Sequence, residues 1–470
     1  MTALIRHPDR LFPAEPTTRS IARELYSTVA DAPIYSPHGH VEAAALLRNE
    51  SFDNPTRLFI SPDHYLTRIL HGAGIPLEAL GVGGGHADGR AAWRLLCENW
   101  DRFLGTPVRY WLEDQLSLLF GLPDELSGET ADRSYDELSE RLAEPAYRPQ
   151  ALFERFNIRV LATTDDPADD LDAHRRLRDS GALSGTVIPT LRADVYLDPS
   201  APAWPAAVAR LAASSGVDCS TWDGLLDGLR RRRSWFRENG GTSTDTGSVD
   251  AWAVPSDEIV LRSIHSRALD GTDTITAAEA ELYRRDMLYR FAEMAADDGM
   301  VMQLHVGALR NHHEPTRAAL GPDTGHDLPL PAEFSRPLQR MLNEFGESPR
   351  FRLVLFTLDE TAFGRDIAPL AGVYPSVFVG APWWFLDTPD AMRRFRAAVT
   401  DAAGFAKTSG FVDDTRALCS IPSRHDASRR VDAGYLAQLV AEHRIGLEDA
   451  RMTMVRLVSD IPRSTFRLPV

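Results

Sequence analysis

The chain has 470 residues, of which 43% are hydrophobic and 25% charged, so its composition is that of an ordinary globular protein and not of a disordered or fibrous one. A formal net charge of −16 argues against a nucleic-acid partner, because phosphate backbones are bound by basic surfaces. A chain of this length can bury one large core and fold alone or as a homo-oligomer.

One basic run, at residues 230–233, departs from this acidic balance. A polar stretch at residues 238–248, rich in Gly, Ser and Thr, follows it. We interpret the run as the solvated end of a helix that leads into a loop, in preference to an anion site.

Three widely spaced cysteines, Cys97, Cys219 and Cys419, form no CxxC motif. This set is typical of a reducing compartment and excludes a disulfide framework and a cysteine zinc cluster. The first 13 residues lack the apolar core of a signal peptide, and no stretch has the length and apolarity to span a bilayer. We therefore predict a cytoplasmic protein without a membrane partner.

Short apolar runs alternate with longer segments of helical spacing, which is typical of an α/β fold. Nearly all residues in these runs are apolar, as expected for parallel strands that are covered on both faces. The predicted strands lie at residues 34–37, 159–163, 186–189, 301–306, 352–357, 376–380 and 411–412. We predict a single domain over residues 1–470, built as a (β/α)8 TIM-type barrel.

The clearest helix signal precedes the predicted strand at residue 301. Thr276 and Glu279 have the spacing of a capping box, Met287 and Phe291 then fall on one face, and Gly299 ends the helix. This arrangement predicts a helix that leads directly into a strand.

Residues 41–150 contain no convincing strand and are predicted to form a mostly helical insertion after the first strand. Helices are expected over residues 91–104 and 109–122, and a third is expected to begin at Ser134, with Glu137 completing a capping box. The glycine run at residues 81–85 is predicted to be a flexible loop and not a phosphate loop, because no Lys-Ser/Thr follows it.

Polar residues at the ends of the predicted strands carry the chemistry. The first strand ends in His38-Gly39-His40, and alternate residues of a strand point to the same side, so both imidazoles can share one divalent ion. Asp414 follows the last predicted strand, and in a barrel such strand ends converge on one face. A first-strand HxH pair with a last-strand Asp resembles the metal constellation of the amidohydrolase superfamily.

Further motifs resemble the uronate isomerase family and occur in that family's order. They are Asp63-His64-Tyr65, the segment 162–167, His305 with Arg310 and Asn311, and Trp383-Trp384-Phe385. The resemblance extends from about residue 20 to the C terminus. It implies a TIM-type barrel that reversibly isomerises D-glucuronate to D-fructuronate and D-galacturonate to D-tagaturonate.

By motif match, the resemblance implies that His38, His40 and Asp414 hold one divalent ion, with zinc expected, and that His305 is a further ligand or a substrate contact. Moving a carbonyl from C1 to C2 also requires a base for the C2 proton and an acid at C1. Asp414 and Tyr65 are the acid/base candidates, with His38 as a third catalytic residue. The sequence leaves open which of them contacts C2.

The carboxylate of a hexuronate calls for a planar guanidinium partner. Arg192, Arg416 and Arg310 all follow predicted strands, and the first two are preferred. His64 and Trp384 are expected to complete the sugar pocket through hydrogen bonds and contact with the apolar ring face.

Several positions keep a second interpretation. The Asp165-Asp166-Pro167 run is as compatible with capping a turn and opening the next helix as with a substrate contact. Trp383 is assigned to the core, and His312 and His313 to an exposed loop. The segment around Arg192 departs from the family pattern, and Asp413 stands next to the presumed metal ligand. The arginine two residues after Asp414 selects Asp414 over its neighbour.

Two other functions remain open. A metal-dependent hydrolase of the same superfamily would use the same ligands to activate water. A non-catalytic sugar-acid binding protein would keep the arginines but not the metal ligands. The Asp63-His64-Tyr65 motif favours the isomerase over the first, and the intact ligand set favours it over the second.

Overall fold

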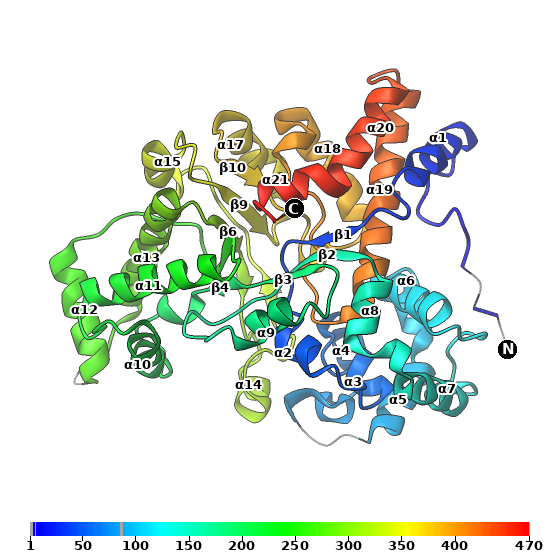
Figure 1. Cartoon of the computed structure of the whole chain (residues 1–470), viewed down its shortest axis with the longest axis horizontal. Helices are drawn as coiled ribbons and strands as arrows, with labels where there is room; N and C mark the ends of the chain where they lie inside the picture. Colours follow the sequence, from blue (N-terminus) through cyan, green and yellow to red (C-terminus); the bar gives the residue numbers. More distant parts are fainter. Residues whose placement is uncertain (1–2, 5, 85–87, 272, 470) are drawn as a thin grey trace.

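Most strands of the protein are short and parallel, and these form two sheets (Figure 1). The computed structural model describes residues 3–4, 6–84, 88–271 and 273–469. The first sheet has the order β1-β2-β3 and the second β10-β9-β6-β5-β4. These strands are β1 Ile34–Ser36, β2 Ile158–Ala162, β3 Thr186–Ile188, β4 Thr190–Arg192, β5 Ser243–Ser248, β6 Val301–Val306, β9 Leu353–Thr357 and β10 Val377–Val379.

The two sheets follow each other along the chain. Only Pro189, which has no N–H to donate to a ladder, separates β3 from β4, and an isolated parallel bridge joins Asp165 to Leu191 beside this break. β1 forms the other edge of the first sheet. Just after β1, the backbone N–H of His40 donates to the carbonyl of Thr415 at 2.9 Å. The predicted α/β class with parallel strands is confirmed, and the ladders themselves form two sheets.

Two expectations for individual segments were wrong. Residues 243–248, predicted to lie in a loop, form β5 in the middle of the second sheet, where Thr244 and Thr246 supply β-branched side chains suited to a strand. Residues 411–412 lie in no strand, and the only ladder contact nearby in the described chain is a bridge between Thr408 and Val379. The first segment was predicted as a loop because it is polar, and the second was predicted as a strand because it is apolar.

Helices cover the sheets and fill the long connections between strands (Figure 1). Their bounds are α1 Pro16–Ser27, α2 Ala43–Arg48, α3 Pro55–Phe59, α4 His64–Gly72, α5 Gly89–Glu98, α6 Pro107–Asp114, α7 Ala131–Ala143, α8 Pro149–Arg155, α9 Asp172–Ser180, α10 Trp204–Ser215, α11 Trp222–Glu238, α12 Glu258–Asp270, α13 Ala277–Asp298, α14 Glu314–Leu320, α15 Gln339–Phe345, α16 Glu360–Ala362, α17 Ala368–Val373, α18 Pro389–Ala403, α19 Ile421–Ala441, α20 Leu447–Val455 and α21 Ile461–Thr465. The two-residue strands β7 Ala308–Leu309 and β8 Leu328–Pro329 pair antiparallel and form a hairpin.

The capping box predicted at α13 is present: the Thr276 side chain accepts from the N–H of Glu279, whose carboxylate accepts from the N–H of Thr276. Gly299 ends the helix with a φ of +80°, as glycine permits. The second predicted capping box was wrong. Ser134 lies inside α7, where its hydroxyl accepts from the indole of Trp93 at 3.0 Å, so a buried side-chain contact explains this serine.

The seven helices α2 to α8 lie between β1 and β2 in the chain. They pack with residues of β1, β2 and β3 in one hydrophobic core that includes Trp93, Phe103, Phe120 and Phe153. Residues Val82–Gly84 of the glycine run form a 3-10 turn, and Gly85 lies outside the described residues. α6 continues into a π-helical turn at Gln115–Leu119.

The arginine run in α11 was predicted to be solvated, and half of it is buried. Arg232 donates to the carbonyls of Pro167 and Ser214 at 2.6 and 3.2 Å. Arg233 forms an ion pair with Asp298 at 2.5 Å. Long side chains with satisfied guanidinium groups can thus be buried in a helix that the sequence presents as charged.

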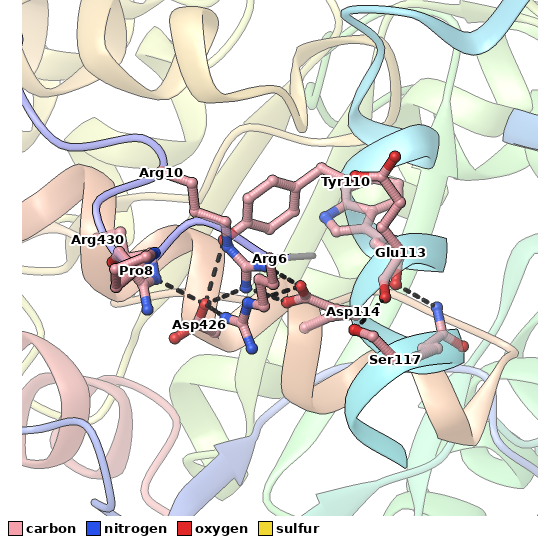
Figure 2. A network of polar contacts seen from close by, with 12 residues as sticks. Arg6, Pro8, Arg10, Tyr110, Glu113, Asp114, Ser117, Asp426 and Arg430 are labelled. Atoms are coloured by element: carbon pink, nitrogen blue, oxygen red, sulfur yellow. Dashed lines mark hydrogen bonds and ion pairs between the residues drawn. The ribbon is translucent and has the colours of Figure 1, made fainter. Parts of the chain in front are cut away.

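A network of ion pairs ties the N-terminal segment to α6 and α19 (Figure 2). Arg6 contacts Asp426 of α19 at 2.6 Å and Asp114 of α6 at 2.9 Å. Arg10 also contacts both carboxylates and donates to Tyr110 at 2.7 Å. Three separate segments are therefore held together by two shared carboxylates.

Among the described residues, we find no helix with the length and apolar character needed to cross a bilayer.

Candidate active site

A cavity of about 360 Å³ opens at the carboxyl ends of the parallel strands. All ten residues predicted for the site line it, although they come from widely separated segments: His38, His40, His64, Tyr65, Arg192, His305, Arg310, Trp384, Asp414 and Arg416. The convergence follows from the topology, because the carboxyl ends of parallel strands meet on one face.

Asp414 lies between the two histidines that follow β1. Its Oδ1 atom is 2.9 Å from Nε2 of His40 and 3.4 Å from Nε2 of His38. Burial alone would raise the pKa of Asp414, but His38 and His40 outweigh it and hold this pKa well below its usual range. The backbone of Asp414 is left-handed, with a φ of +40°, a conformation that side chains other than glycine seldom adopt and that often marks a functional position.

The neighbouring Asp413 points elsewhere. Its Oδ2 atom is 3.0 Å from Nε2 of His425 in α19, and it does not line the cavity. Of the two adjacent acids, only Asp414 thus lies beside both histidines.

His305 at the end of β6 contacts a carboxylate that the sequence analysis missed. Its Nδ1 atom is 2.7 Å from Oδ1 of Asp245 in β5, which is buried, and Arg192 lies 3.4 Å from the other oxygen of this carboxylate. Burial lowers the pKa of His305, with Asp245 opposing it, and His305 and Arg192 lower the pKa of Asp245. Asp245 was missed because its strand was taken for a loop; the alternating threonines on either side were the available signal.

Two groups of donor atoms in this cavity could hold a metal ion, and they share His38. One is His38, His40 and Asp414, and the other is His38, Asp245 and His305; within each, the donor atoms lie within 4.8 Å of one another. Nε2 of His305 is buried and has no hydrogen-bond partner among the described residues. Imidazole nitrogens and a carboxylate, one of them unsatisfied, form a donor set that suits a divalent metal ion.

Each predicted arginine already has a carboxylate partner at the rim of the cavity. Arg192 contacts Asp194 at 2.9 Å. Arg310 contacts Asp327, and Arg416 contacts Asp323, each at 2.6 Å. Asp323 and Asp327 were not foreseen, because they follow no strand and stand in a polar loop. The cavity therefore holds several positive groups whose charge the protein itself balances.

Tyr65 lies in the first turn of α4, whose N-cap Asp63 accepts from the N–H of Tyr65 at 2.8 Å. Arg424 of α19 lies over the Tyr65 ring at 4.8 Å and contacts Asp387 at 2.6 Å. Burial raises the pKa of Tyr65, and Arg424 lowers it less. The expectation that a nearby cation would tune this phenol is thus met only in part, because burial dominates.

Arg424 and Asp387 form a buried pair at the cavity, and the sequence analysis assigned neither of them a role. Arg424 is buried, lines the cavity and lies 3.9 Å above the ring of Trp111. Burial raises the pKa of Asp387 to about 7, with Arg424 opposing it. Nothing local marks this pair, because α19 and the segment after β10 meet only in the folded chain.

The aromatic residues divide between the cavity and the core. The rings of His64 and Trp384 lie 6.1 Å apart, and both residues line the cavity. Trp383, assigned to the core, packs in a buried cluster and also borders the cavity, with its ring 4.8 Å from that of His305.

The Asp165-Asp166-Pro167 run does not line the cavity. Asp166 caps a turn by accepting from the N–H of Ala168 at 2.8 Å. α9 begins only at Asp172, so the run opens no helix directly. The contacts of this run are therefore those of a turn cap and not of a substrate contact.

Imidazole, carboxylate and guanidinium groups gathered at the carboxyl ends of parallel strands define an α/β enzyme with a potential metal site. A family model described as glucuronate isomerase matches residues 16–464, and the chain belongs to this family. A uronate isomerase from Corynebacterium efficiens is 49% identical over 99% of this chain and 100% of its own length. The residues matched by the family model include every motif of the cavity.

Solved structures agree with this assignment. The glucuronate isomerase from Caulobacter crescentus has a TM-score of 0.96 and 42% identity, covering 99% of this chain and 97% of its own. A Lactobacillus casei protein described as a metal-dependent hydrolase shares the fold alone, with a TM-score of 0.53 and 13% identity over 94% of this chain and 97% of its own. The chain is thus an enzyme of the uronate isomerase type, and the hydrolase and binding-protein alternatives are not favoured.

Proposed function

We propose that the protein interconverts D-glucuronate with D-fructuronate and D-galacturonate with D-tagaturonate, with one zinc ion held by His38, His40 and Asp414. The observation that carries the proposal is the cluster of these three residues in a cavity that also presents four arginines and a tyrosine. We further propose that both sheets form the wall of one (β/α)8 barrel, with residues 41–150 as its insertion. The cytoplasmic location and a homo-oligomeric state stay predictions.

The role of a bound zinc ion would be to polarise the sugar oxygens at C1 and C2 and to stabilise negative charge that develops on them. His38, His40 and Asp414 supply nitrogen and oxygen donors of the kind this ion prefers. His305 keeps a free Nε2 atom in the same cavity, so it serves as a further ligand or as a contact to a sugar hydroxyl.

The two acid/base candidates differ in how readily they ionise. Asp414 is held as a carboxylate by His38 and His40, so of the two it is the one ionised and able to receive a proton, although its lowered pKa makes it a weak base. Burial keeps the phenol of Tyr65 protonated, so it can donate a proton toward C1. The proposal therefore assigns acceptance of the proton to Oδ1 or Oδ2 of Asp414 and donation to Oη of Tyr65.

Arg416 is the arginine best placed to exchange partners. Its side chain is 41% exposed and that of Asp323 is 51% exposed, whereas Asp327, the partner of Arg310, is almost fully buried. Exposed ion pairs contribute little free energy, so a substrate carboxylate can replace Asp323 on Arg416 at small cost. The guanidinium would then bind the C6 carboxylate in a bidentate manner.

The test is to incubate zinc-loaded protein with each uronate and to measure ketose formation. The proposal expects ketose from both substrates, with loss of activity by at least about a thousandfold in Asp414→Asn and by about a hundredfold or more in Tyr65→Phe. Absence of ketose from both uronates would refute it. A hydrolase would instead cleave a lactone or amide and leave free uronates unchanged, and a binding protein would retain uronate without turnover.

The assignment of the two proton-transfer roles needs a separate measurement. In deuterated water, deuterium incorporation at C2 of the recovered aldose reports proton removal independently of net turnover. Tyr65→Phe should keep slow exchange at C2, and Asp414→Asn should lose it. The reverse pattern would exchange the two roles.

A further inference from the structure

Three histidines that take no part in the proposed reaction lie close together, in segments that also carry cavity-lining residues such as His64 and Asp327. His71 lies in the last turn of α4, His313 is the N-cap of α14, and His326 lies in the loop that precedes β8. We propose that these three imidazoles, here called the rim trio, form a second binding site for a zinc-class divalent ion, distinct from the site formed by His38, His40 and Asp414.

The geometry of the rim trio resembles that of the histidines in the cavity. The rings of His71 and His326 have centroids 5.0 Å apart and an interplanar angle of 81°, compared with 5.2 Å and 84° for His38 and His40. The rings of His313 and His326 are 5.5 Å apart at 32°, and those of His38 and His305 are 4.9 Å apart at 32°. Two imidazoles on one tetrahedral zinc ion place their centroids about 5 Å apart, because each Zn–N distance is about 2 Å.

Two members of the rim trio have one ring nitrogen held by a neighbour. Nδ1 of His71 lies 3.0 Å from the carbonyl of Ile75, which can only accept, so Nδ1 carries the proton and Nε2 keeps a free lone pair. Nδ1 of His313 lies 2.7 Å from the hydroxyl of Thr316, which leaves its Nε2 atom available. This arrangement is typical of metal-ligating histidines, whose second nitrogen usually bonds to a carbonyl or another polar group.

His326, at the centre of the trio, has a buried Nδ1 atom without a hydrogen-bond partner among the described residues. Its backbone is fixed, because its carbonyl accepts from the N–H of His312 at 2.7 Å, next to the β7–β8 hairpin. Asp327, the following residue, accepts from the N–H of Asn311 at 2.7 Å. His326 thus has an unsatisfied ring nitrogen and a backbone held by hydrogen bonds, and its ring contacts those of His71 and His313.

The donors of the trio do not yet converge. In the described part of the chain, only the two groups in the cavity have all their donor atoms within 4.8 Å. His313 is exposed, so its side chain can move toward His326 without disturbing the core, with the hydroxyl of Thr316 rotating to follow Nδ1. Ion binding would then fasten the loop of residues 311–327 to α4. Because that loop carries Asp323 and Asp327, and α4 carries His64 and Tyr65, the ion would restrain one side of the cavity mouth.

The experiment is a zinc titration of the full-length enzyme by equilibrium dialysis with metal analysis. We expect wild type to bind two equivalents, and His71→Ala and His326→Ala each to weaken the second by at least about tenfold, as expected for losing one of three ligands. The first equivalent and the activity that it supports should be unchanged, which separates failure of this proposal from failure of the proposed function. Binding of one equivalent only, or a second equivalent insensitive to both substitutions, would overturn the proposal.

Two histidine substitutions serve as controls. His312 is exposed in the same loop and His443 is exposed in the turn after α19, and neither belongs to the rim trio. His312→Ala and His443→Ala should keep the second equivalent, and its loss in either would refute the assignment of ligands. The second equivalent should also slow tryptic cleavage after the exposed Arg317 of α14 at least about threefold in wild type and not in His326→Ala, because closed loops resist proteolysis. An unchanged cleavage rate would refute the fastening of the loop.

Discussion

Substitution of Asp245 by Asn removes a buried negative charge from the interior of the site while preserving the shape of the side chain. Asp245 is 1% exposed and lies 2.7 Å from Nδ1 of His305 and 3.4 Å from Arg192. A charge-assisted hydrogen bond of this kind contributes about 2 kcal/mol. The carboxylate also fixes the tautomer of His305, so that Nε2 faces the cavity with a free lone pair. The side-chain amide of an asparagine at this position can present its NH2 group to Nδ1 of His305 instead of its oxygen, so it no longer fixes the tautomer of His305.

We expect kcat of Asp245→Asn to fall about 30-fold, which corresponds to about 2 kcal/mol of transition-state stabilisation. The assay is initial-rate ketose formation from D-glucuronate, with circular dichroism and metal content measured on the same preparation. The matched control is Asp194→Asn, because Asp194 contacts Arg192 at 2.9 Å and does not contact His305. That variant should change KM more than kcat. A folded, metal-loaded Asp245→Asn enzyme with wild-type kcat would refute the reasoning.

Three further changes have distinct expected outcomes. Arg416→Ala should raise KM for the uronates about tenfold to a hundredfold with a smaller change in kcat, measured by steady-state kinetics, because a bidentate carboxylate contact is lost; the 83% exposed Arg336→Ala should change neither constant. Burial lowers the pKa of His174 from 6.5 to about 4, so the folded state resists protonation, and the contribution of His174 to the unfolding free energy should fall by about 3 kcal/mol as pH drops from 6.5 to 4. Urea titrations should show this dependence greatly reduced in His174→Gln, and identical pH profiles would contradict it. Asp426→Ala should destabilise the fold by about 3 kcal/mol in the same titrations, because Arg6, Arg10 and Arg430 lose their shared carboxylate; Asp390→Ala, which removes an exposed pair with Arg393, should cost less than about 1 kcal/mol.

Local patterns predicted the parts of the fold that depend on nearby residues. The strand at residues 301–306 and the helix capped by Thr276 and Glu279 were predicted correctly, because hydrophobic spacing and capping act within a few residues. β5 was missed because buried Thr, Ser and Asp residues resemble a loop when their partners are unknown. Arg232 and Arg233 were wrongly predicted to be solvated for the same reason, because the carbonyls and the carboxylate that bind their guanidinium groups come from other segments.

The sequence by itself determined the family and the ten candidate site residues, because HxH, Asp63-His64-Tyr65 and the other motifs are short patterns that can be read along one chain. Only the tertiary structure decided which partners complete them. Asp245 reaches His305 from the neighbouring strand, Arg424 reaches Tyr65 and Asp387 from α19, and the rim trio gathers histidines from α4 and the loop around α14. These pairings depend on distances between remote segments, and burial then sets their protonation, so neither follows from local sequence.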